Sequence, residues 1–560
     1  MKSMIVNSLK NYLPLEKEEI YNLIEIPPSS ELGDYSFPCF SLAGKLKKNP
    51  VQIAQDLKQK VKLPKEIEKI EIKGAYLNFF VNKKIFCENA VKNILGKKEN
   101  YGKTNIKKQK TIIEFSQPNT HKAFHVGHIR GTSIGESLSR ISEFLGNKVI
   151  RANYSGDTGM HIAKWIWCYK KYHSKEKLKN DESWIASIYV DAVKKITNNP
   201  EFQKEVDEIN KKLEDKKDKN ILELWKKTRK LSIDSWKKIY QQLNTRFDVH
   251  YFESEVEKSA KEISLKLLKQ GIAKKSEGAV IMDLEEYNLG VWVLLRSDQT
   301  VLYSAKDLAL TEKKSKDYKL DKALNVVGSE QDLHFKQLFK TLELMDFKQR
   351  KKFSHITFGM VRLPTGKMSS RTGDNILYSD FIKEITDYAK QNIKKRIPRI
   401  SQQELEKRAL IVAIAAIKYS MLKQSPNKNI IFQKDEALNF EGDTGPYLLY
   451  SYARASSILK KSKIKITKLF KIKNIENKEL ELCKKLLEFS EIVENSYKNL
   501  NPSLIANYSY QLSKIFNEFY HECPVINSEN ENFRISLVES FRIVLKNSLN
   551  LLGISVVEEM

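Results

Sequence analysis

The sequence predicts an α/β protein in which a parallel sheet is followed by a helical domain. Short β-branched runs alternate with stretches of helical periodicity between residues 111 and 363, and such alternation forms a parallel sheet through right-handed crossovers. Strand patterns fade after about Ser379, and helical patterns dominate from Phe381 to Leu552. The 560 residues are enough for about three to four domains of roughly 150 residues each.

A separate small α/β unit is expected at residues 1–100. Its helices and strands are expected, in chain order, at 2–23 (helical), 43–61 (helical), 70–72 (strand) and 76–80 (strand). Pro27 and Pro28 interrupt the first helical pattern, because proline cannot continue a helix. The polar, basic stretch 96–110 reads as a linker to the next domain.

The segment 111–154 is expected to form a strand, a polar loop, a helix and a second strand. The helix is predicted from four apolar residues at steps of four, three and four, which are Ile134, Leu138, Ile141 and Leu145. His125 and His128 lie where the loop enters this helix. A helix N-terminus offers unpaired N–H groups and partial positive charge, so this position suits a phosphate.

The remainder of the central region is expected to contain an insertion and further strands. Residues 171–271 are charged and mostly helical in pattern, with few turn signals, which indicates a helical insertion. Later strands are expected at 279–282, 291–303 (with a hairpin turn at 297–299), 323–328 and 356–363, and a helix is expected at 332–344.

The composition is strongly basic. Lys plus Arg number 97 and Asp plus Glu 70, which gives a net charge of +27; this favours a polyanionic partner such as nucleic acid, although an AT-rich genome would also enrich Lys, Asn and Ile. The five cysteines are scattered and include no Cys-x-x-Cys pair, which favours a reducing compartment. The absence of about 18 consecutive apolar residues and of a signal-like N-terminus argues against a membrane span and secretion, so a cytoplasmic location is expected.

Three short patterns suggest chemistry, and each has an ordinary structural alternative. His-x-Gly-His at 125–128 is typical of a phosphate-binding turn or of a plain helix start. The basic segment Lys367 to Arg371 suits a mobile polyphosphate lid or a surface turn. His121, His125 and His128 have spacings of four and three that a zinc ion could use, but Pro118 and Asn119 place His121 in a loop, so no protein-held metal is expected.

Taken together, these motifs resemble the HIGH and KMSKS signatures of class I aminoacyl-tRNA synthetases, and among them the arginyl-tRNA synthetase family most closely. The resemblance covers nearly the whole chain. The stretches that carry it are Gly33–Tyr35, Leu77–Phe79, Ser116–Arg130, Tyr154–Met160, Tyr303–Ala309, Gly328–Gln331, Phe358–Val361, Glu441–Tyr447 and Leu551–Ile554.

The resemblance implies an architecture and an activity. It implies a tRNA-elbow-binding domain at 1–100, a Rossmann-type catalytic domain at 105–380 that carries the helical insertion, and an all-α anticodon-binding domain at 381–560. The implied reaction converts L-arginine and ATP to arginyl-adenylate and pyrophosphate, then transfers arginine to the 3′-terminal adenosine of tRNA(Arg) and releases AMP. The alternative is a non-catalytic tRNA-binding protein that retains this fold. A monomer is expected.

The resemblance also implies roles for individual residues. The expected catalytic residues are Lys122, His125, His128 and Lys367. The expected ATP ligands are His125, Gly127, His128, Met360, Val361, Lys367, Met368 and Ser369, with Mg²⁺ carried in by ATP. The expected arginine ligands are Glu114, Ser116, Asn119, Tyr303, Asp307 and Gln331. The expected tRNA contacts are Tyr447, Tyr450 and Arg454.

The chain departs from the family pattern at two places. The lid segment reads Lys-Met-Ser-Ser-Arg, so its second lysine is missing; Lys122, which precedes the first signature, is expected to supply that charge. Thr158 stands where the family often has an aromatic residue, which bears on local packing.

Overall fold

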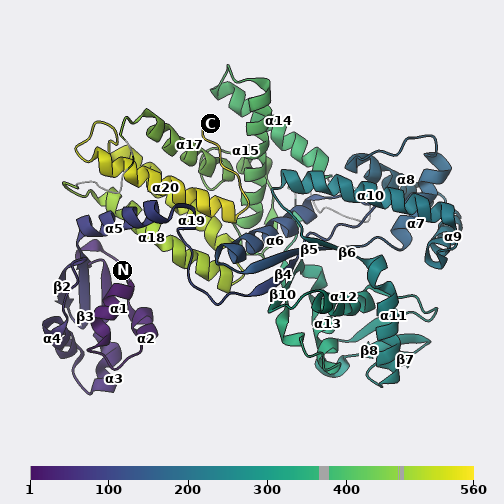
Figure 1. The fold of residues 1–560 in the computed structure, drawn as a ribbon, viewed down its shortest axis with the longest axis horizontal. Helices are drawn as coiled ribbons and strands as arrows, with labels where there is room; N and C mark the ends of the chain where they lie inside the picture. Colours follow the sequence, from purple (N-terminus) through teal and green to yellow (C-terminus); the bar gives the residue numbers. More distant parts are fainter. Residues whose placement is uncertain (1, 363, 365–376, 465, 467–471) are drawn as a thin grey trace. The chain divides into compact units, whose positions relative to one another are not determined.

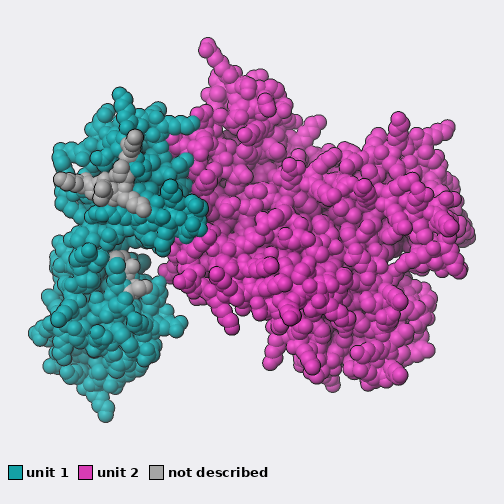
Figure 2. All heavy atoms as spheres, in the orientation of Figure 1, with its two compact units in different colours: residues 1–101, 458–487, 514–543 teal, residues 102–457, 488–513, 544–560 magenta. Residues whose placement is uncertain are grey.

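The computed structural model describes residues 2–362, 364, 377–464, 466 and 472–560 (Figure 1). The chain forms two compact units, coloured in Figure 2. The first comprises Met1–Tyr101, Ile458–Leu487 and Lys514–Ile543, and the second comprises Gly102–Ser457, Glu488–Ser513 and Val544–Met560.

The N-terminal part of the first unit is a three-stranded antiparallel sheet with helices. The strand order is β1-β3-β2. The elements are α1 (Lys2–Lys10), α2 (Lys17–Leu23), β1 (Tyr35–Pro38), α3 (Ala43–Leu46), α4 (Pro50–Lys60), β2 (Ile67–Lys73), β3 (Tyr76–Val81) and α5 (Lys83–Lys97). The strands expected at 70–72 and 76–80 are confirmed as β2 and β3, whereas β1 was not predicted. It is only four residues long and begins within the turn-like Gly33-Asp34-Tyr35 segment.

A five-stranded parallel sheet forms the centre of the second unit, in the order β11-β10-β4-β5-β6. Its strands are β4 (Lys110–Glu114), β5 (Lys148–Ser155), β6 (Val249–Phe252), β10 (Lys322–Gly328) and β11 (Phe353–Phe358), and the helices that flank them include α6 (Val126–Phe144), α12 (Tyr303–Asp317) and α13 (Asp332–Leu344). From β4 the chain first adds β5 and β6 on one side, and it later adds β10 and β11 on the other side. The strand order therefore reverses beside β4. In open α/β sheets, ligands bind at this switch point, outside the carboxyl ends of the strands.

The predicted insertion contains a strand of the central sheet. Helices α7 (Met160–Tyr172), α8 (Glu182–Asn198), α9 (Phe202–Asp215) and α10 (Lys219–Gln242) gather together, and β6 and α11 (Glu253–Lys269) follow (Figure 1). The sequence pattern did not reveal β6, because its four residues are too few to show periodicity. Its edge position is fixed by pairing with β5.

The strands expected near 279–282 and 291–303 lie outside the parallel sheet. They are β8 (Ala279–Asp283) and β9 (Val291–Leu295), which pair antiparallel with each other and with β7 (Lys274–Ser276). The short connection between β8 and β9 holds no crossover helix, and a parallel pair requires one. The strand expected at 291–303 is shorter than predicted: β9 ends at Leu295, and α12 begins at Tyr303.

The C-terminal region is helical, as predicted, apart from one short strand. Its elements are α14 (Tyr378–Arg396), α15 (Gln402–Leu422), β13 (Ile430–Ile431), α16 (Lys434–Ala437), α17 (Gly445–Lys461), α18 (Asn477–Lys498), α19 (Ser503–Glu522) and α20 (Glu531–Leu551). Strand β13 pairs with β12 (Val361–Arg362), which follows β11. This pairing fixes the backbone just after the sheet.

A buried ion cluster holds α6 against β5. Arg151 is fully buried and contacts two carboxylates of α6: its Nε lies 2.9 Å from Oε2 of Glu136, and its Nη1 lies 2.6 Å from Oε1 of Glu143. Arg140 adds a second contact to Glu136 at 2.7 Å. Helix α6 begins at the two signature histidines, so this ion cluster fixes the position of the helix that carries them.

Replacing Arg151 with Met should destabilise the second unit strongly. The change leaves Glu136 buried with less neutralising charge, and breaking such a buried pair costs about 3–5 kcal/mol. Arg246→Met is the matched control, because Arg246 contacts the same Glu143 at 2.8 Å but is 59% exposed and should contribute at most about 1 kcal/mol. The readout is thermal unfolding followed by circular dichroism. Equal midpoints for the two variants would contradict the assigned role of the cluster.

Candidate functional site

The loop that leaves β4 is held in a strained conformation by the insertion. Ser116, Gln117 and His121 all have left-handed backbone, with φ of 80°, 55° and 61°, a conformation that persists only where the surroundings impose it. The backbone N–H of His121 donates to Oγ of Ser232 at 3.1 Å, and its Nε2 lies 2.7 Å from Oγ1 of Thr228. Both partners belong to α10.

Tyr240, also on α10, orders the same loop. Its hydroxyl lies 2.9 Å from Oγ of Ser116 and accepts from the amide of Asn153 at 2.9 Å. Ser116 also accepts from Thr132 at 2.8 Å. Ser116 is thus bonded to Tyr240 and Thr132 and does not line the cavity described below.

The two signature histidines form a reciprocal cap at the start of α6. The N–H of Gly127 donates to Nδ1 of His125, and the N–H of His125 donates to Nδ1 of His128, each at 3.2 Å. A ring nitrogen that accepts a hydrogen bond carries no proton, so in each neutral imidazole the hydrogen is on Nε2. A Cβ atom at position 127 would lie 3.0 Å from the His125 ring. The close approach of this ring is therefore a structural reason for glycine at this position.

Both imidazoles are neutral at physiological pH. Burial, followed by the charge of Lys122, lowers the pKa of His125 to about 4. Burial lowers the pKa of His128 well below its ordinary value, with His125 and then Lys122 adding to the effect. Lys122 lies close enough to influence both rings, and its ammonium sits 5.5 Å from the centre of the Tyr189 ring of the insertion. The pair can donate hydrogen bonds without carrying charge.

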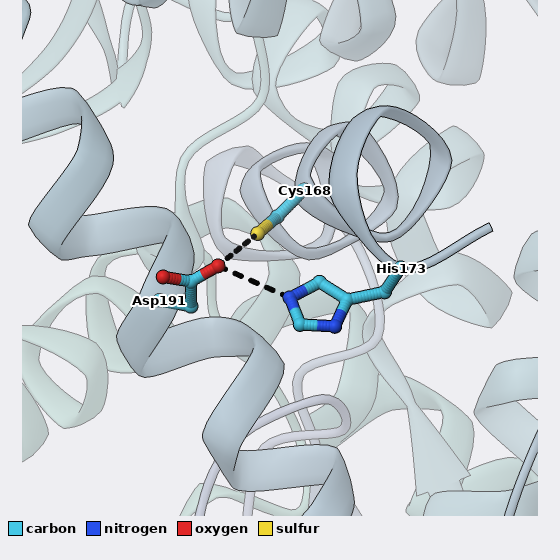
Figure 3. A group of neighbouring side chains, drawn as sticks. All are labelled: Cys168, His173 and Asp191. Carbon is cyan, nitrogen blue, oxygen red and sulfur yellow. Dashed lines mark hydrogen bonds and ion pairs between the residues drawn. The ribbon is translucent and has the colours of Figure 1, made fainter. Parts of the chain in front are cut away.

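The ligand atoms of His121, His125 and His128 are not grouped at metal-binding distances among the described residues. Within the part of the chain that the structure describes, the one group of three candidate metal ligands is Cys168, His173 and Asp191, in α7 and α8 (Figure 3). Nε2 of His173 lies 3.0 Å from Asp191, and its Nδ1 lies 2.6 Å from Glu176. Burial lowers the pKa of His173, but the hydrogen bonds to these carboxylates outweigh it and raise the pKa overall.

A cavity at the carboxyl edge of the sheet brings most of the predicted arginine ligands together. Its lining comes from the carboxyl ends of β4 and β5 and the loops after them, from the segment that follows β10, and from α11, α12 and α13. The lining residues are Glu114, Gln117, Asn119, Tyr154, Gly156, Glu253, Tyr303, Asp307, Glu330, Gln331, His334 and Phe335. Five of the six predicted ligands are in this set, and Ser116 is the one that is not.

Glu114 is the most deeply enclosed acid of the cavity. It and Lys314 of α12 are both 2% exposed, and the ammonium lies 2.5 Å from Oε2 of the carboxylate. The amides of Gln117 and Asn325 donate to Oε1 at 3.0 and 3.1 Å. The charge of Glu114 is therefore already balanced within the protein.

Asp307 has a neutral partner instead. Nε2 of His334 lies 2.5 Å from Oδ2 of Asp307, and the indole N–H of Trp292 donates to Nδ1 of His334 at 3.2 Å. Trp can only donate, so Nδ1 is unprotonated, and the His334 ring is a neutral donor to the carboxylate. Asp307 keeps its negative charge in the cavity.

The two remaining acids of the cavity also differ in whether a cation neutralises them. Glu253, at the start of α11, pairs with Lys306 at 2.7 Å. Glu330 is exposed and, among the described residues, has no cation within ion-pair distance. The unbalanced negative charge is therefore that of Asp307 and Glu330, which suits a cationic ligand.

Arg130 connects α6 to the segment that follows β11. Its buried guanidinium donates to the carbonyl groups of Gly359 at 2.9 Å and Pro426 at 3.0 Å. The next residues, Met360 and Val361, were predicted as ATP contacts; Met360 is 48% exposed and Val361 is buried. Lys367, Met368 and Ser369 lie outside the described residues.

The predicted tRNA contacts lie on α17. Tyr447, Tyr450 and Arg454 are all half-buried. Arg454 donates to the hydroxyl of Tyr450 at 3.2 Å, and the Tyr447 ring lies 5.8 Å from that of Tyr510. In the described part of the chain, no helix combines the length and hydropathy needed to cross a bilayer.

Sequence reasoning missed several residues of this site. Glu253 follows β6, which the sequence did not predict, and His334 lies in the first turn of α13, where nothing in the sequence pattern marks it. Glu330 lies within Gly328–Gln331, a stretch that carries the family resemblance, so the sequence did offer a signal for it as a site residue. Glu182 of α8 accepts from the N–H of Phe124, just before the histidines, at 3.1 Å.

Glu182→Gln should remove a pH dependence of stability. Burial raises the pKa of Glu182 to about 7, so its protonated form stabilises the fold fully below pH 4.5, and this contribution is lost as pH rises towards 7. The loss amounts to about 3 kcal/mol at most. The glutamine variant should therefore gain stability relative to the parent as pH rises from 4.5 to 8.

The control is Glu223→Gln, which removes an exposed ion pair with Lys227. Its stability difference from the parent should stay within about 1 kcal/mol. The measurement is urea unfolding at several pH values, and a constant difference between parent and Glu182→Gln would contradict the assigned burial of a carboxyl beside the loop.

Comparison with known proteins identifies the families that the chain resembles. Residues 90–434 match the family described as class I (R) tRNA synthetases, catalytic domain, residues 448–560 match the DALR anticodon binding domain, and residues 1–81 match the arginyl tRNA synthetase N-terminal domain. Arginine–tRNA ligases of Clostridium acetobutylicum and Clostridium perfringens are 37% and 38% identical, each over all of both chains. The structure of Thermus thermophilus arginyl-tRNA synthetase matches with a TM-score of 0.81 and 26% identity, over 100% of this chain and 99% of that one.

Proposed function

The chain belongs to the class I arginyl-tRNA synthetases and is an arginine–tRNA ligase, and we propose that the cavity at the sheet edge holds L-arginine while the start of α6 holds ATP. The observation that carries this proposal is that Glu114 and Asp307 line one cavity together with Asn119, Tyr303 and Gln331. The alternative of a non-catalytic tRNA-binding protein is not favoured, since full-length relatives are ligases.

Arginine recognition follows from the charge balance of the cavity. The guanidinium has five N–H donors and a permanent charge, and Asp307 supplies an unbalanced carboxylate for it. Glu114, held in place and neutralised by Lys314, adds oxygen acceptors. Tyr303, which is 61% exposed, would lie over the same group, and Asn119 and Gln331 would hold the α-amino end. Ser116 would act by fixing the loop.

The α6 terminus is suited to the phosphates of ATP. The Nε2–H groups of His125 and His128 would donate to phosphate oxygens, and Gly127, Met360 and Val361 would contact the nucleotide. Lys122 and Lys367 would hold the outer phosphates, and Met368 and Ser369 would contribute to the lid. Mg²⁺ would arrive with ATP, because it is held mainly by phosphates and water and not by an all-protein cage.

In the activation step, an oxygen of the arginine carboxylate attacks the α-phosphorus, and the bond to the β-phosphate oxygen breaks. Pyrophosphate leaves with the electron pair, and the protein's contribution is positioning and stabilisation of charge. Loss of one such donor typically costs about 3–4 kcal/mol of transition-state stabilisation. Neutral histidines can donate throughout this step without a proton transfer.

The tRNA would bind through α17 and the N-terminal domain. Tyr447, Tyr450 and Arg454 offer stacking faces and a cation for anticodon nucleotides, the family match assigns the region an anticodon-binding domain, and the net charge of +27 favours the phosphate backbone. We place the monomeric enzyme in the cytoplasm. The described cysteines are free and buried, which is typical of a reducing compartment.

Asp307→Asn should weaken the use of arginine. His334 can still donate to the asparagine oxygen, so the fold is preserved while the charge that faces the guanidinium is lost. We expect kcat/KM for arginine to fall roughly 10²- to 10³-fold, mainly through KM, in charging of tRNA(Arg) with arginine as the only amino acid.

Asp317→Asn is the control on the same helix. Asp317 pairs with Lys313 at 3.1 Å and does not line the cavity, so KM for arginine should be unchanged. An arginine KM for Asp307→Asn equal to that of the parent would remove the cavity from consideration as the arginine site.

A further inference from the structure

The hydroxyl of Tyr154 is buried without a hydrogen-bond partner among the described residues. Tyr154 lies near the carboxyl end of β5 and lines the cavity that we assign to arginine. Buried hydroxyls almost always have a partner, and an exception in a native fold calls for an explanation. Here the exception stands at the wall of a binding cavity.

The surroundings of this hydroxyl are negatively charged. Burial, followed by the charges of Asp307, Glu253 and Glu114, raises the pKa of Tyr154 well above its ordinary value. The phenol is therefore neutral at physiological pH. It is within electrostatic reach of four carboxylates, since Asp157 also contributes, and it is bonded to none of them among the described residues. The space beside these groups would therefore favour a cation with several donors.

The protein's own bonds limit how many acceptors remain for a guanidinium. Oδ2 of Asp307 already accepts from His334. Glu114 already contacts Lys314, Gln117 and Asn325. A guanidinium has five N–H groups and no acceptor, so an oxygen beside those of the two acids adds to the acceptors that it can use.

We propose that Tyr154 is an arginine-binding residue whose phenolic oxygen accepts an N–H of the guanidinium. The inference deepens the proposed assignment of the cavity and rests on it. It gives the phenolic oxygen, which has no partner among the described residues, a donor from the substrate. The tyrosine thereby helps to distinguish a planar, many-donor cation from the compact ammonium of lysine.

The neighbouring strand provides a matched control. Tyr251 pairs with Tyr154 in the parallel register between β5 and β6, and parallel-sheet neighbours in register lie on the same face. The Tyr251 hydroxyl donates to Asp317 at 3.1 Å, and Tyr251 does not line the cavity. The two tyrosines thus share residue type and register but differ in whether the protein satisfies the hydroxyl.

The test compares Tyr154→Phe with Tyr251→Phe in the full-length enzyme. The first variant removes a hydroxyl that has no hydrogen-bond partner among the described residues, so its melting temperature should equal or exceed that of the parent. Its KM for arginine should rise about tenfold or more, because hydrogen bonds to charged groups are the stronger kind. KM for ATP and kcat should change by less than about threefold. Arginine-dependent pyrophosphate exchange into ATP, with tRNA present, gives all three constants.

Tyr251→Phe should show the opposite pattern, with a lower melting temperature and an unchanged KM for arginine. If Tyr154→Phe leaves the arginine KM unchanged while Asp307→Asn raises it, the cavity assignment holds and the role of Tyr154 is wrong. If neither variant raises it, the cavity assignment itself fails. A lower melting temperature for Tyr154→Phe, without a KM effect, would assign the hydroxyl a structural role.

Discussion

The site depends on how the protein neutralises carboxylates buried at the carboxyl edge of its parallel sheet. An unpaired buried charge is costly, and two of the four acids that line the cavity have a cation close by: Glu114 has Lys314, and Glu253 has Lys306. Asp307 has a neutral donor, His334, as its partner instead, and the exposed Glu330 has no cation within ion-pair distance among the described residues. This uneven pairing leaves negative charge in the cavity without destabilising the fold that carries it, and a cationic substrate completes the balance.

The inserted helices support the same edge from the side. Helix α10 bonds to the strained loop through Thr228, Ser232 and Tyr240, and its Arg229 lies 2.7 Å from the fully buried Asp157 after β5. The loop ends at the two histidines, so the insertion determines where α6 begins. Their tautomers follow from the cap that they form, because each Nδ1 accepts a backbone N–H. The positions of the two histidines, their neutral charge state and the direction of their Nε2–H donors are thus all fixed by the protein before a ligand binds.

Much of this organisation could be predicted from sequence, for identifiable reasons. Apolar periodicity predicted the strand before Glu114, the helix of Ile134 and Leu138, and α13, since each is long or regular enough to show a pattern. Family resemblance grouped Glu114 with Asp307, and the cavity contains both. Strand β6 was not predictable at four residues. The cation partners of the acids were not predictable either. Lys314 is 200 positions from Glu114, and only the sheet and α12 together bring the two residues into contact.

The orientation of a short side chain is also decided by tertiary packing. Resemblance placed Ser116 among the substrate ligands, yet its hydroxyl is bonded to Tyr240 and Thr132. The central claim is that unbalanced carboxylate charge selects the substrate, and citrulline, a neutral near-isostere of arginine, tests it most directly. Charging of tRNA(Arg) should show a kcat/KM for citrulline at least about 10⁴-fold below that for arginine. Values within about tenfold of each other would contradict recognition by charge.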